Sequence, residues 1–312
     1  MEKLSQRKEG RNPLIPSGNQ GPLVVILGPT SSGKSSLAVR LAKKLHGEVV
    51  SADSRQLYKE LSVGTGMISK KGMRGVPHHL LRVVSIKKNF GVAQYQREAL
   101  KIIGKIRVKG KLPFLVGGSA LYIYAVADGL MFPSVKPNLV LRKKLGKLSI
   151  QELQKKLKAL DPQRAKTVDR QNPRRLIRAI EIVLSTKKPV PLLKKQSAFS
   201  PLLFIGIRKS PIELKKSIQK RVGERLRKGW VQETKKLLKS GVSQKQIREI
   251  GLGYQWMLSY LKHEISKEEL VERIQRAESD FARRQMSWFR KDRRIHWIKN
   301  KKGAMRLFRS FL

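Results

Sequence analysis

The 312-residue chain contains no cysteine and few acidic residues, and each shortage excludes a class of protein. Without cysteine there can be no disulfide, no zinc site built on thiolates and no cysteine nucleophile. Only 22 Asp and Glu stand against 69 Lys and Arg, which gives a formal net charge of +47 at pH 7. Long apolar runs are also missing, since no stretch approaches the roughly 18 residues of a membrane-spanning segment. We therefore expect a folded protein with a polyanionic partner and no membrane association.

The composition of the chain changes along its length, and the changes predict its domains. Residues 1–20 are polar and basic and lack the apolar core of a signal peptide, which predicts a disordered basic tail and a cytoplasmic location. Residues 134–200 are rich in lysine and helical in pattern, and we interpret them as a small helical insert domain. The flanking segments, 21–133 and 201–312, are predicted to form one core domain.

A glycine-rich loop follows the apolar run 23–27 and precedes a segment with helical periodicity, as a P-loop requires. Its glycines let successive backbone N–H groups point at phosphate oxygens, and the helix that follows adds the positive end of its dipole. The lysine would supply a charge to the phosphates, and the last serine a ligand for a phosphate-bound Mg²⁺. The loop predicts a di- or triphosphate site without saying which ligand binds. It consists of Gly28, Pro29, Thr30, Ser31, Ser32, Gly33, Lys34 and Ser35.

Two further strands are predicted at residues 47–52 and 112–116, and each ends in polar residues. Asp53 follows the first, and Ser119 follows the second after two glycines. Because the carboxyl ends of parallel strands meet at one edge, both side chains should lie near the P-loop. The alternative for each side chain is a structural role, as the cap of a turn or of a helix start. The fold class is therefore α/β, a P-loop NTPase-like core in which helices flank a parallel sheet, with the helical insert added.

Basic residues gather at two helices. Arg174, Arg175 and Arg178 lie near the start of a predicted helix that begins at Pro173, where three guanidiniums oppose the helix dipole and so favour a ligand-binding use. In the segment 281–291, Arg283, Ser287, Arg290 and, beyond it, Arg294 recur at helical spacing around Trp288 and Phe289. Such interleaving suits phosphate contacts with base stacking, although the two aromatic residues are equally typical of a core.

Several blocks together make the chain resemble the bacterial tRNA dimethylallyltransferase family. Besides the P-loop, they are 51–58 (Ser-Ala-Asp-Ser-Arg-Gln-Leu-Tyr), 77–79 (Pro-His-His), 116–122 (Val-Gly-Gly-Ser-Ala-Leu-Tyr), 172–181, 253–254 and 284–290. The resemblance implies transfer of a dimethylallyl group from dimethylallyl diphosphate to N6 of the adenine adjacent to the anticodon (position 37) of tRNA, with release of diphosphate. It also implies a Mg²⁺ cofactor bound through Ser35 and the diphosphate, and a monomer.

The resemblance also assigns roles to particular residues. Asp53 matches the general base, Thr30 a residue beside the diphosphate, and Arg221 an arginine on the leaving group; the composition alone does not single out Arg221. Positions that match tRNA contacts are Asp53, Ser54, Arg55, Gln56, Ser119, Arg142, Gln171, Asn172, Pro173, Arg174, Arg175, Arg284, Gln285, Trp288 and Arg290. The chain departs from the family pattern at Met67, where a lysine is usual, and at Ser119, where threonine is usual.

Three other functions remain open at this point. A P-loop alone equally allows a nucleotide or small-molecule kinase, and the prenyl chemistry equally allows a transferase that acts on free adenylate. A non-catalytic RNA-binding protein would not need Lys34, Ser35 and Asp53 intact. The excess of basic residues favours tRNA as the acceptor, because tRNA is itself a polyanion.

Overall fold

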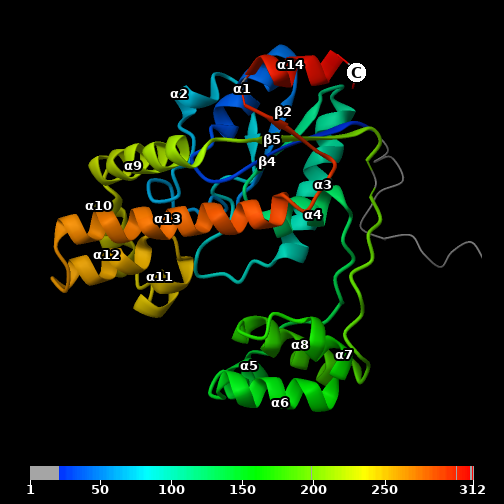
Figure 1. Cartoon of the computed structure of the whole chain (residues 1–312), viewed down its shortest axis with the longest axis vertical. Coiled ribbons are helices and arrows are strands. Elements are labelled where there is room, and N and C mark those ends of the chain that lie inside the picture. The colour runs from blue at the N-terminus through cyan, green and yellow to red at the C-terminus, as the bar shows by residue number, and fades with distance from the viewer. Residues whose placement is uncertain (1–20, 198, 300, 310, 312) are drawn as a thin grey trace, which may run out of the picture. The chain divides into compact units, whose positions relative to one another are not determined.

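The computed structural model describes residues 21–197, 199–299, 301–309 and 311. The predicted tail, 1–20, lies outside the described residues. The chain forms two compact units, one of residues up to 129 and from 196 onward, and the other Leu130–Lys195 (Figure 1). The second unit begins and ends slightly before the predicted insert, 134–200, because Leu130 and Lys195 pair in a bridge and Gln196 N–H donates to Asp128 O in the first unit (2.8 Å).

A six-stranded parallel sheet with the order β3-β2-β4-β1-β5-β6 is the centre of the first unit. Its middle strands are fully buried apolar runs, because helices cover both faces of the sheet. The strands are β1 (Leu23–Leu27), β2 (Glu48–Ala52), β3 (His78–His79), β4 (Pro113–Gly117), β5 (Leu202–Ile207) and β6 (Ile295–Ile298). Since all pairings are parallel, the carboxyl ends of β1, β2, β4 and β5 share one edge.

Alternate residues of the strands pack against two separate layers of helices. Val24 and Ile26 face α1 (Lys34–Lys44) and α14 (Lys301–Arg309), whereas Leu23 and Val25 face the opposite layer. That layer consists of α3 (Val92–Val108), α4 (Ala120–Ala127) and the end of α13 (Lys267–Phe289). The short helix α2 (Lys70–Met73) precedes β3.

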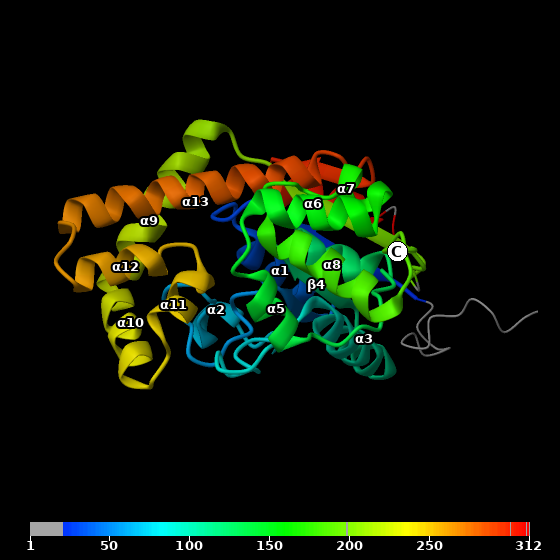
Figure 2. The ribbon, with the colours of Figure 1, turned by 90° about the horizontal axis from the view of Figure 1, so that it is seen from below.

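A group of helices after β5 extends the first unit beside the carboxyl edge of the sheet, as both ribbon views show (Figure 2). Ser210 with Glu213, and Ser266 with Glu269, form capping boxes that start the first and last of these helices. The apolar centre of the group surrounds Trp230 and Tyr254. Its members are α9 (Pro211–Arg227), α10 (Trp230–Lys239), α11 (Gln244–Ile250), α12 (Tyr254–Leu261) and α13.

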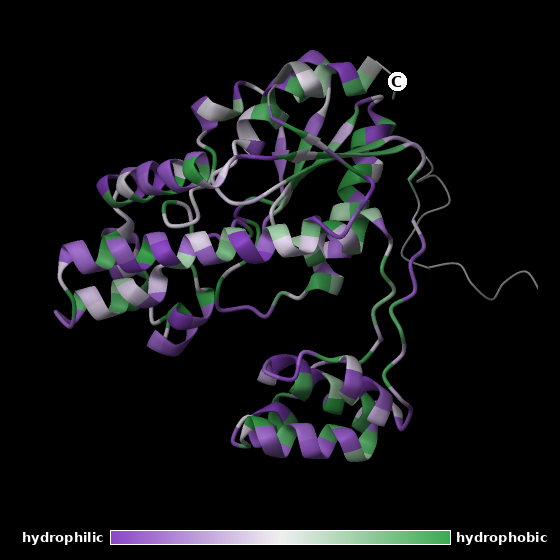
Figure 3. Cartoon of the chain, viewed as in Figure 1, coloured by the Kyte–Doolittle hydropathy of each residue, from purple (hydrophilic) through white to green (hydrophobic). Residues whose placement is uncertain are grey.

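The second unit is a small helical bundle with its own apolar core. Figure 3 shows its hydrophobic residues on the inner faces of the helices and hydrophilic residues outside. The buried Glu181 carboxylate accepts hydrogen bonds from Arg142 Nη2 (2.6 Å), Arg178 Nη1 (2.5 Å) and Asn138 N–H (2.7 Å). The helices are α5 (Leu139–Leu145), α6 (Ile150–Leu160), α7 (Pro162–Thr167) and α8 (Pro173–Thr186).

One local prediction was wrong, and two short strands were not predicted. His78 and His79 form the edge strand β3, and Ile295–Ile298 form β6. Arg294 does not continue the helical row of basic residues, because α13 ends at Phe289. Its guanidinium pairs instead with Asp128 (2.7 Å) and Asp292 (2.8 Å).

Candidate active site

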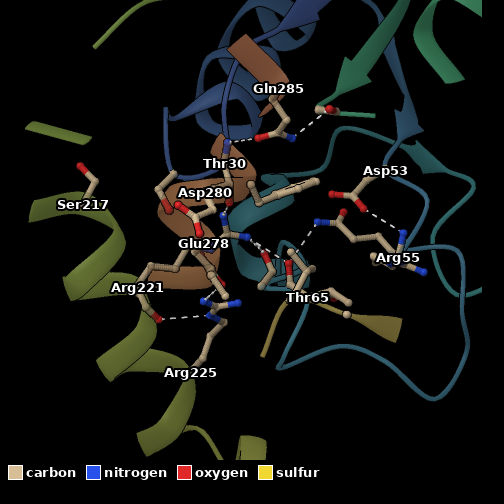
Figure 4. A pocket seen from close by; sticks show the side chains of 18 of the residues that line it. Thr30, Asp53, Arg55, Thr65, Ser217, Arg221, Arg225, Glu278, Asp280 and Gln285 are labelled. Carbon is tan, nitrogen blue, oxygen red and sulfur yellow. Dashed lines mark hydrogen bonds and ion pairs between the residues drawn. The ribbon is translucent and has the colours of Figure 1, made fainter. Parts of the chain in front are cut away.

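A pocket of about 1380 Å³ opens at the carboxyl edge of the sheet, between the P-loop and helices α9, α12 and α13. Figure 4 shows side chains from these separate elements converging on it. Thr30, Lys34, Asp53, Ser119 and Arg221 all line this pocket. The structure therefore brings together the residues that the sequence predicted for the diphosphate and for the general base.

The P-loop lies close to the neighbouring strand, and glycine is required where the backbones approach. Gly28 has φ +145°, and a Cβ there would lie 2.9 Å from Ile207 O. Lys209, just beyond β5, donates to Ser31 O (3.1 Å) and to Ser217 Oγ (2.6 Å), which holds the loop from the α9 side. The Ser31 and Ser32 hydroxyls are buried without a hydrogen-bond partner in the described part of the chain. Such orphaned polar atoms indicate a loop built for an oxygen-rich ligand.

Lys34 begins helix α1 and donates its ammonium proton to Pro29 O. Burial and the Arg221 charge together lower the pKa of Lys34 to about 7, and the Asp53 carboxylate partly opposes them. Positive charge at this point of the pocket thus lacks enough negative charge to balance it. A bound diphosphate would supply that charge and return Lys34 to its ammonium form.

Arg221, on α9, is held by acceptors on three sides. Its Nη1 donates to Thr30 Oγ1 (3.0 Å), and its Nη2 donates to Thr65 O (3.0 Å) and Gly66 O (3.1 Å). Burial lowers the pKa of Arg221, and the Arg225 charge adds to that effect, while Glu278 and Asp53 raise the pKa. Gly66 is necessary here because a Cβ would lie 2.3 Å from Arg221 Nη2. A planar guanidinium fixed in this way presents a preorganised charge to a leaving group.

The loop that supplies these carbonyls is itself anchored by Glu233 on α10. The Glu233 carboxylate accepts from the N–H groups of Ser62 (2.7 Å), Val63 (2.8 Å) and Gly64 (2.9 Å) and from Tyr254 OH (2.7 Å). Arg225 adds a second anchor, because it donates to Gly64 O (2.8 Å), pairs with the buried Glu278 and lies over the Trp230 ring at 4.4 Å. No local sequence pattern points to Lys209, Glu233 or the Arg225–Glu278 pair, because their contacts join distant segments.

Asp53 is half-buried immediately after β2, and one carboxylate oxygen, Oδ1, accepts from Arg55 N–H (2.9 Å). This bond is the turn cap that the sequence left as an alternative, and it fixes the carboxylate rather than removing it from the pocket. The Ser119 hydroxyl accepts from Ser54 N–H (3.0 Å) and thereby ties the ends of β2 and β4 together. A half-buried carboxylate facing cationic groups can accept a proton from a bound substrate.

The residues that the resemblance assigns to tRNA lie in different environments. Arg284 and Arg290 are exposed on and just after α13, and Trp288 is 47% exposed, whereas the adjacent Phe289 is fully buried. In contrast, the Gln285 amide is buried within the first unit. Ser54, Arg55 and Gln56 line the pocket with Asp53.

In the helical insert, Gln171, Pro173, Arg174 and Arg175 are exposed, and Asn172 caps α8 through Arg175 N–H (3.2 Å). Arg175 also lies 3.6 Å from the Asp169 carboxylate. The Arg142 and Arg178 guanidiniums are held by Glu181, so they organise the insert itself.

These features define an α/β protein in which a glycine-rich loop with the P-loop pattern and a carboxylate line one pocket at the carboxyl edge of the sheet. A sequence model described as IPP transferase matches residues 56–292, and the chain belongs to this family of transferases. It is 40% identical over 284 residues to the tRNA dimethylallyltransferase of Acetivibrio thermocellus, covering 88% of this chain and 91% of that protein.

Solved structures show the same likeness. The tRNA isopentenylpyrophosphate transferase of Bacillus halodurans has a TM-score of 0.68 at 33% identity, with 93% of this chain and 95% of that chain covered. A eukaryotic dimethylallyltransferase, described as acting on tRNA, has a TM-score of 0.71 at 25% identity, with 86% of this chain and 69% of that chain covered. The predicted α/β class with a parallel sheet flanked by helices is confirmed.

Proposed function

We propose that this enzyme transfers the dimethylallyl group of dimethylallyl diphosphate to N6 of the adenine adjacent to the anticodon of a tRNA. The observation that carries the proposal is the meeting of a cationic P-loop site and the Asp53 carboxylate in one pocket. The curated relatives named tRNA dimethylallyltransferase support the choice of donor and acceptor.

In this reaction, N6 forms a bond to the first carbon of the allylic group while the bond from that carbon to the diphosphate oxygen breaks. The electron pair of the broken bond leaves with the diphosphate, and the N6 proton passes to the Asp53 carboxylate. The nitrogen lone pair is delocalised into the purine ring, so removal of the proton during attack assists a weak nucleophile. General-base assistance of this kind contributes about 10²–10⁴-fold to a rate.

The departing diphosphate gathers negative charge, and the P-loop side of the pocket is arranged to receive it. Arg221 and Lys34 supply fixed positive charge, and the N–H groups at the start of α1 supply aligned dipoles. Mg²⁺ fits the site if the diphosphate carries it, because Ser31, Ser32 and Ser35 offer hydroxyls. Within the described residues, no group of three or more His, Asp or Glu could hold a metal ion. When bound, Mg²⁺ would stabilise the charge on the leaving diphosphate.

Recognition of the RNA rests on the exposed basic residues of the chain. Arg284, Arg290, Arg174 and Arg175 are exposed and suit phosphate contacts, and the exposed Trp288 face suits stacking on an unpaired base. The target adenine must turn out of its stack to reach the pocket, at a cost of a few kcal/mol that these contacts would offset. We take the active species to be a cytoplasmic monomer. Among the described helices, none combines the length and the apolar character needed to cross a membrane.

The proposal is tested by incubating the enzyme with Mg²⁺ and dimethylallyl diphosphate labelled in the allyl group, together with unmodified tRNA, AMP or ATP. Label is expected in tRNA alone. Label in AMP would assign a free-adenylate prenyltransferase, and transfer of the ATP γ-phosphate to any acceptor would assign a kinase. A tRNA affinity that does not fall with rising salt would contradict RNA recognition, because about tenfold or larger losses are expected when several phosphates are contacted.

A further inference from the structure

Gln285 projects from α13 between the P-loop and the end of β4, and its side chain is 6% exposed. Its Oε1 accepts from Thr30 N–H (2.8 Å), and its Nε2 donates to Gly118 O (2.9 Å) (Figure 4). One amide therefore links two loops that lie on different strands of the sheet. Both of its polar ends are therefore engaged within the chain.

The chemistry of this link suits a primary amide. One partner is a backbone donor and the other is a backbone acceptor, so the residue between them must accept at one end and donate at the other. Gly118 is matched to this contact, because a Cβ at Gly118 would lie 2.2 Å from Gln285 Nε2. A carboxylate at position 285 would keep the bond to Thr30 but place a second acceptor against Gly118 O.

The two linked loops carry the two halves of the reaction site. On one side, the Thr30 hydroxyl accepts from Arg221, which faces the leaving group. On the other side, Gly118 precedes Ser119, whose hydroxyl accepts from Ser54 N–H next to Asp53. Gly117 is packed so closely on β2 that a Cβ would lie 2.0 Å from Ala52 O, so the two strand ends move together. Gln285 thus sets the distance between the P-loop, which would bind the diphosphate, and the Asp53 carboxylate, which would act as the general base.

We propose that Gln285 is a positioning residue that fixes the P-loop relative to Asp53, and that it is not a contact for tRNA. The inference rests on the proposed prenyl transfer. A displacement of about 1 Å between reacting groups can reduce a rate by on the order of 100-fold. Loss of the link should therefore reduce kcat and leave RNA binding nearly intact.

The test compares Gln285→Glu and Gln285→Met with Arg284→Ala, which alters the adjacent exposed residue. For each protein, kcat and KM for tRNA are measured together with the dissociation constant for tRNA and the thermal melting curve, so that rates refer to folded enzyme. Both Gln285 variants should lose about 10–100-fold in kcat with a tRNA dissociation constant within about twofold of wild type. Arg284→Ala should instead raise the dissociation constant for tRNA.

A pH series separates positioning from a general loss of packing. When the carboxyl of Gln285→Glu is protonated, it again donates at one oxygen and accepts at the other, so its kcat relative to wild type should rise as the pH falls. The ratio for Gln285→Met should stay flat, since methionine offers no such group. Any pH dependence that the three proteins share cancels in these ratios.

The proposal is overturned if Gln285→Met weakens tRNA binding by tenfold or more and keeps the wild-type kcat, or if the Gln285→Glu ratio does not respond to pH. Inorganic diphosphate with Mg²⁺, titrated by calorimetry, gives a readout that does not depend on prenyl transfer. Gln285→Met should bind it about tenfold more weakly than wild type. Failure of the wild-type enzyme to prenylate tRNA would overturn the proposed function, whereas unchanged diphosphate binding in Gln285→Met would overturn the positioning role.

Discussion

Strand β2 has a carboxylate at each end, Glu48 at its start and Asp53 just after its last residue, and the two lie in opposite electrostatic settings. Glu48 is buried, and three basic side chains lie against it: His79 Nε2 lies 2.7 Å away, Lys111 Nζ 2.8 Å and Lys109 Nζ 3.8 Å. Asp53 is half-buried and accepts one backbone hydrogen bond, from Arg55. The cations near it, Lys34 and Arg221, are short of negative charge.

This difference distinguishes a carboxylate that stabilises the fold, Glu48, from one that is placed to take part in a reaction, Asp53. Around Glu48 the charges are satisfied within the chain, so the cluster has no need of a ligand. Burial alone would raise the pKa of Glu48, but hydrogen bonds from Lys111 and His79 outweigh it and hold the pKa below its usual value. At the other end of the strand, buried cations with lowered pKa values line an open pocket, an arrangement typical of a functional site.

The largest expected effect is on the rate when Asp53 is changed. Asp53→Asn keeps the size and the turn bond but removes the base, so kcat at saturating tRNA should fall by about 10²–10⁴-fold. Single-turnover transfer of labelled dimethylallyl groups measures it. Glu48→Gln is the matched control, since it makes the same chemical change at the other end of β2 and should retain the wild-type rate. Equal rate losses in both variants would contradict the assignment of Asp53 as the base and of Glu48 as a structural carboxylate.

The next effect distinguishes two arginines that both donate to backbone carbonyls. Arg221→Lys keeps a charge but loses the planar fork, and kcat should fall by on the order of 100-fold. Arg107→Lys is the control, because Arg107 binds Pro22 O (2.9 Å) before β1, on the side of the sheet away from the pocket. Its variant should lose stability only. If Arg107→Lys reduced kcat per folded molecule as strongly as Arg221→Lys, the pocket assignment would be wrong.

A smaller effect concerns stability at the Glu48 end. Glu48→Gln should destabilise the fold by about 1–3 kcal/mol at neutral pH, because a buried carboxylate hydrogen-bonded to cations is lost. Since the folded-state pKa of Glu48 is lowered, its stabilisation is full above the unfolded pKa and is lost as the pH falls through the folded value. Urea unfolding should therefore show a difference between the two proteins that shrinks in acid. A difference that grows in acid would contradict the assignment.

The smallest expected effect is the uptake of a proton by Lys34 when diphosphate binds. Because its pKa in the free enzyme is about 7, diphosphate binding at pH 8 should make Lys34 take up about 1 proton. Calorimetry in buffers of different ionisation enthalpy measures the uptake for wild type and for Lys34→Met. The difference between the two should fall below pH 7, where Lys34 is already charged. Equal uptake at pH 8 would mean that Lys34 carries its charge before the diphosphate arrives.

The sequence was sufficient for the part of the site that local pattern encodes. An apolar run followed by the P-loop motif places Lys34 and Ser35 at a helix start, and a polar residue after a buried strand places Asp53 and Ser119 at the same edge. The mixed roles of Trp288 and Phe289 were left open because helical spacing alone does not say which side faces the core. The structure resolves them, with Phe289 buried and Trp288 exposed.

The parts that were missed depend on contacts between distant segments. Arg221 was chosen only through the resemblance, since its three acceptors come from the P-loop and from the loop after β2. The local sequence does not distinguish Glu233 from an exposed glutamate of a helix, because its contacts with residues 62–64 depend on the fold. Arg142 and Gln285, which the resemblance places on tRNA, are engaged inside the fold. Strand β6 is four residues long, too short for periodicity to separate it from the preceding helical pattern.

We propose that the P-loop of this enzyme holds a leaving group while carbon is transferred to an adenine. This proposal is tested most directly by digesting tRNA to nucleosides after reaction with labelled dimethylallyl diphosphate and identifying the labelled nucleoside. The label is expected on N6 of the adenosine beside the anticodon, and Asp53→Asn should form far less of this product than Glu48→Gln. Label on another nucleoside, or an Asp53→Asn variant as active as Glu48→Gln, would contradict it.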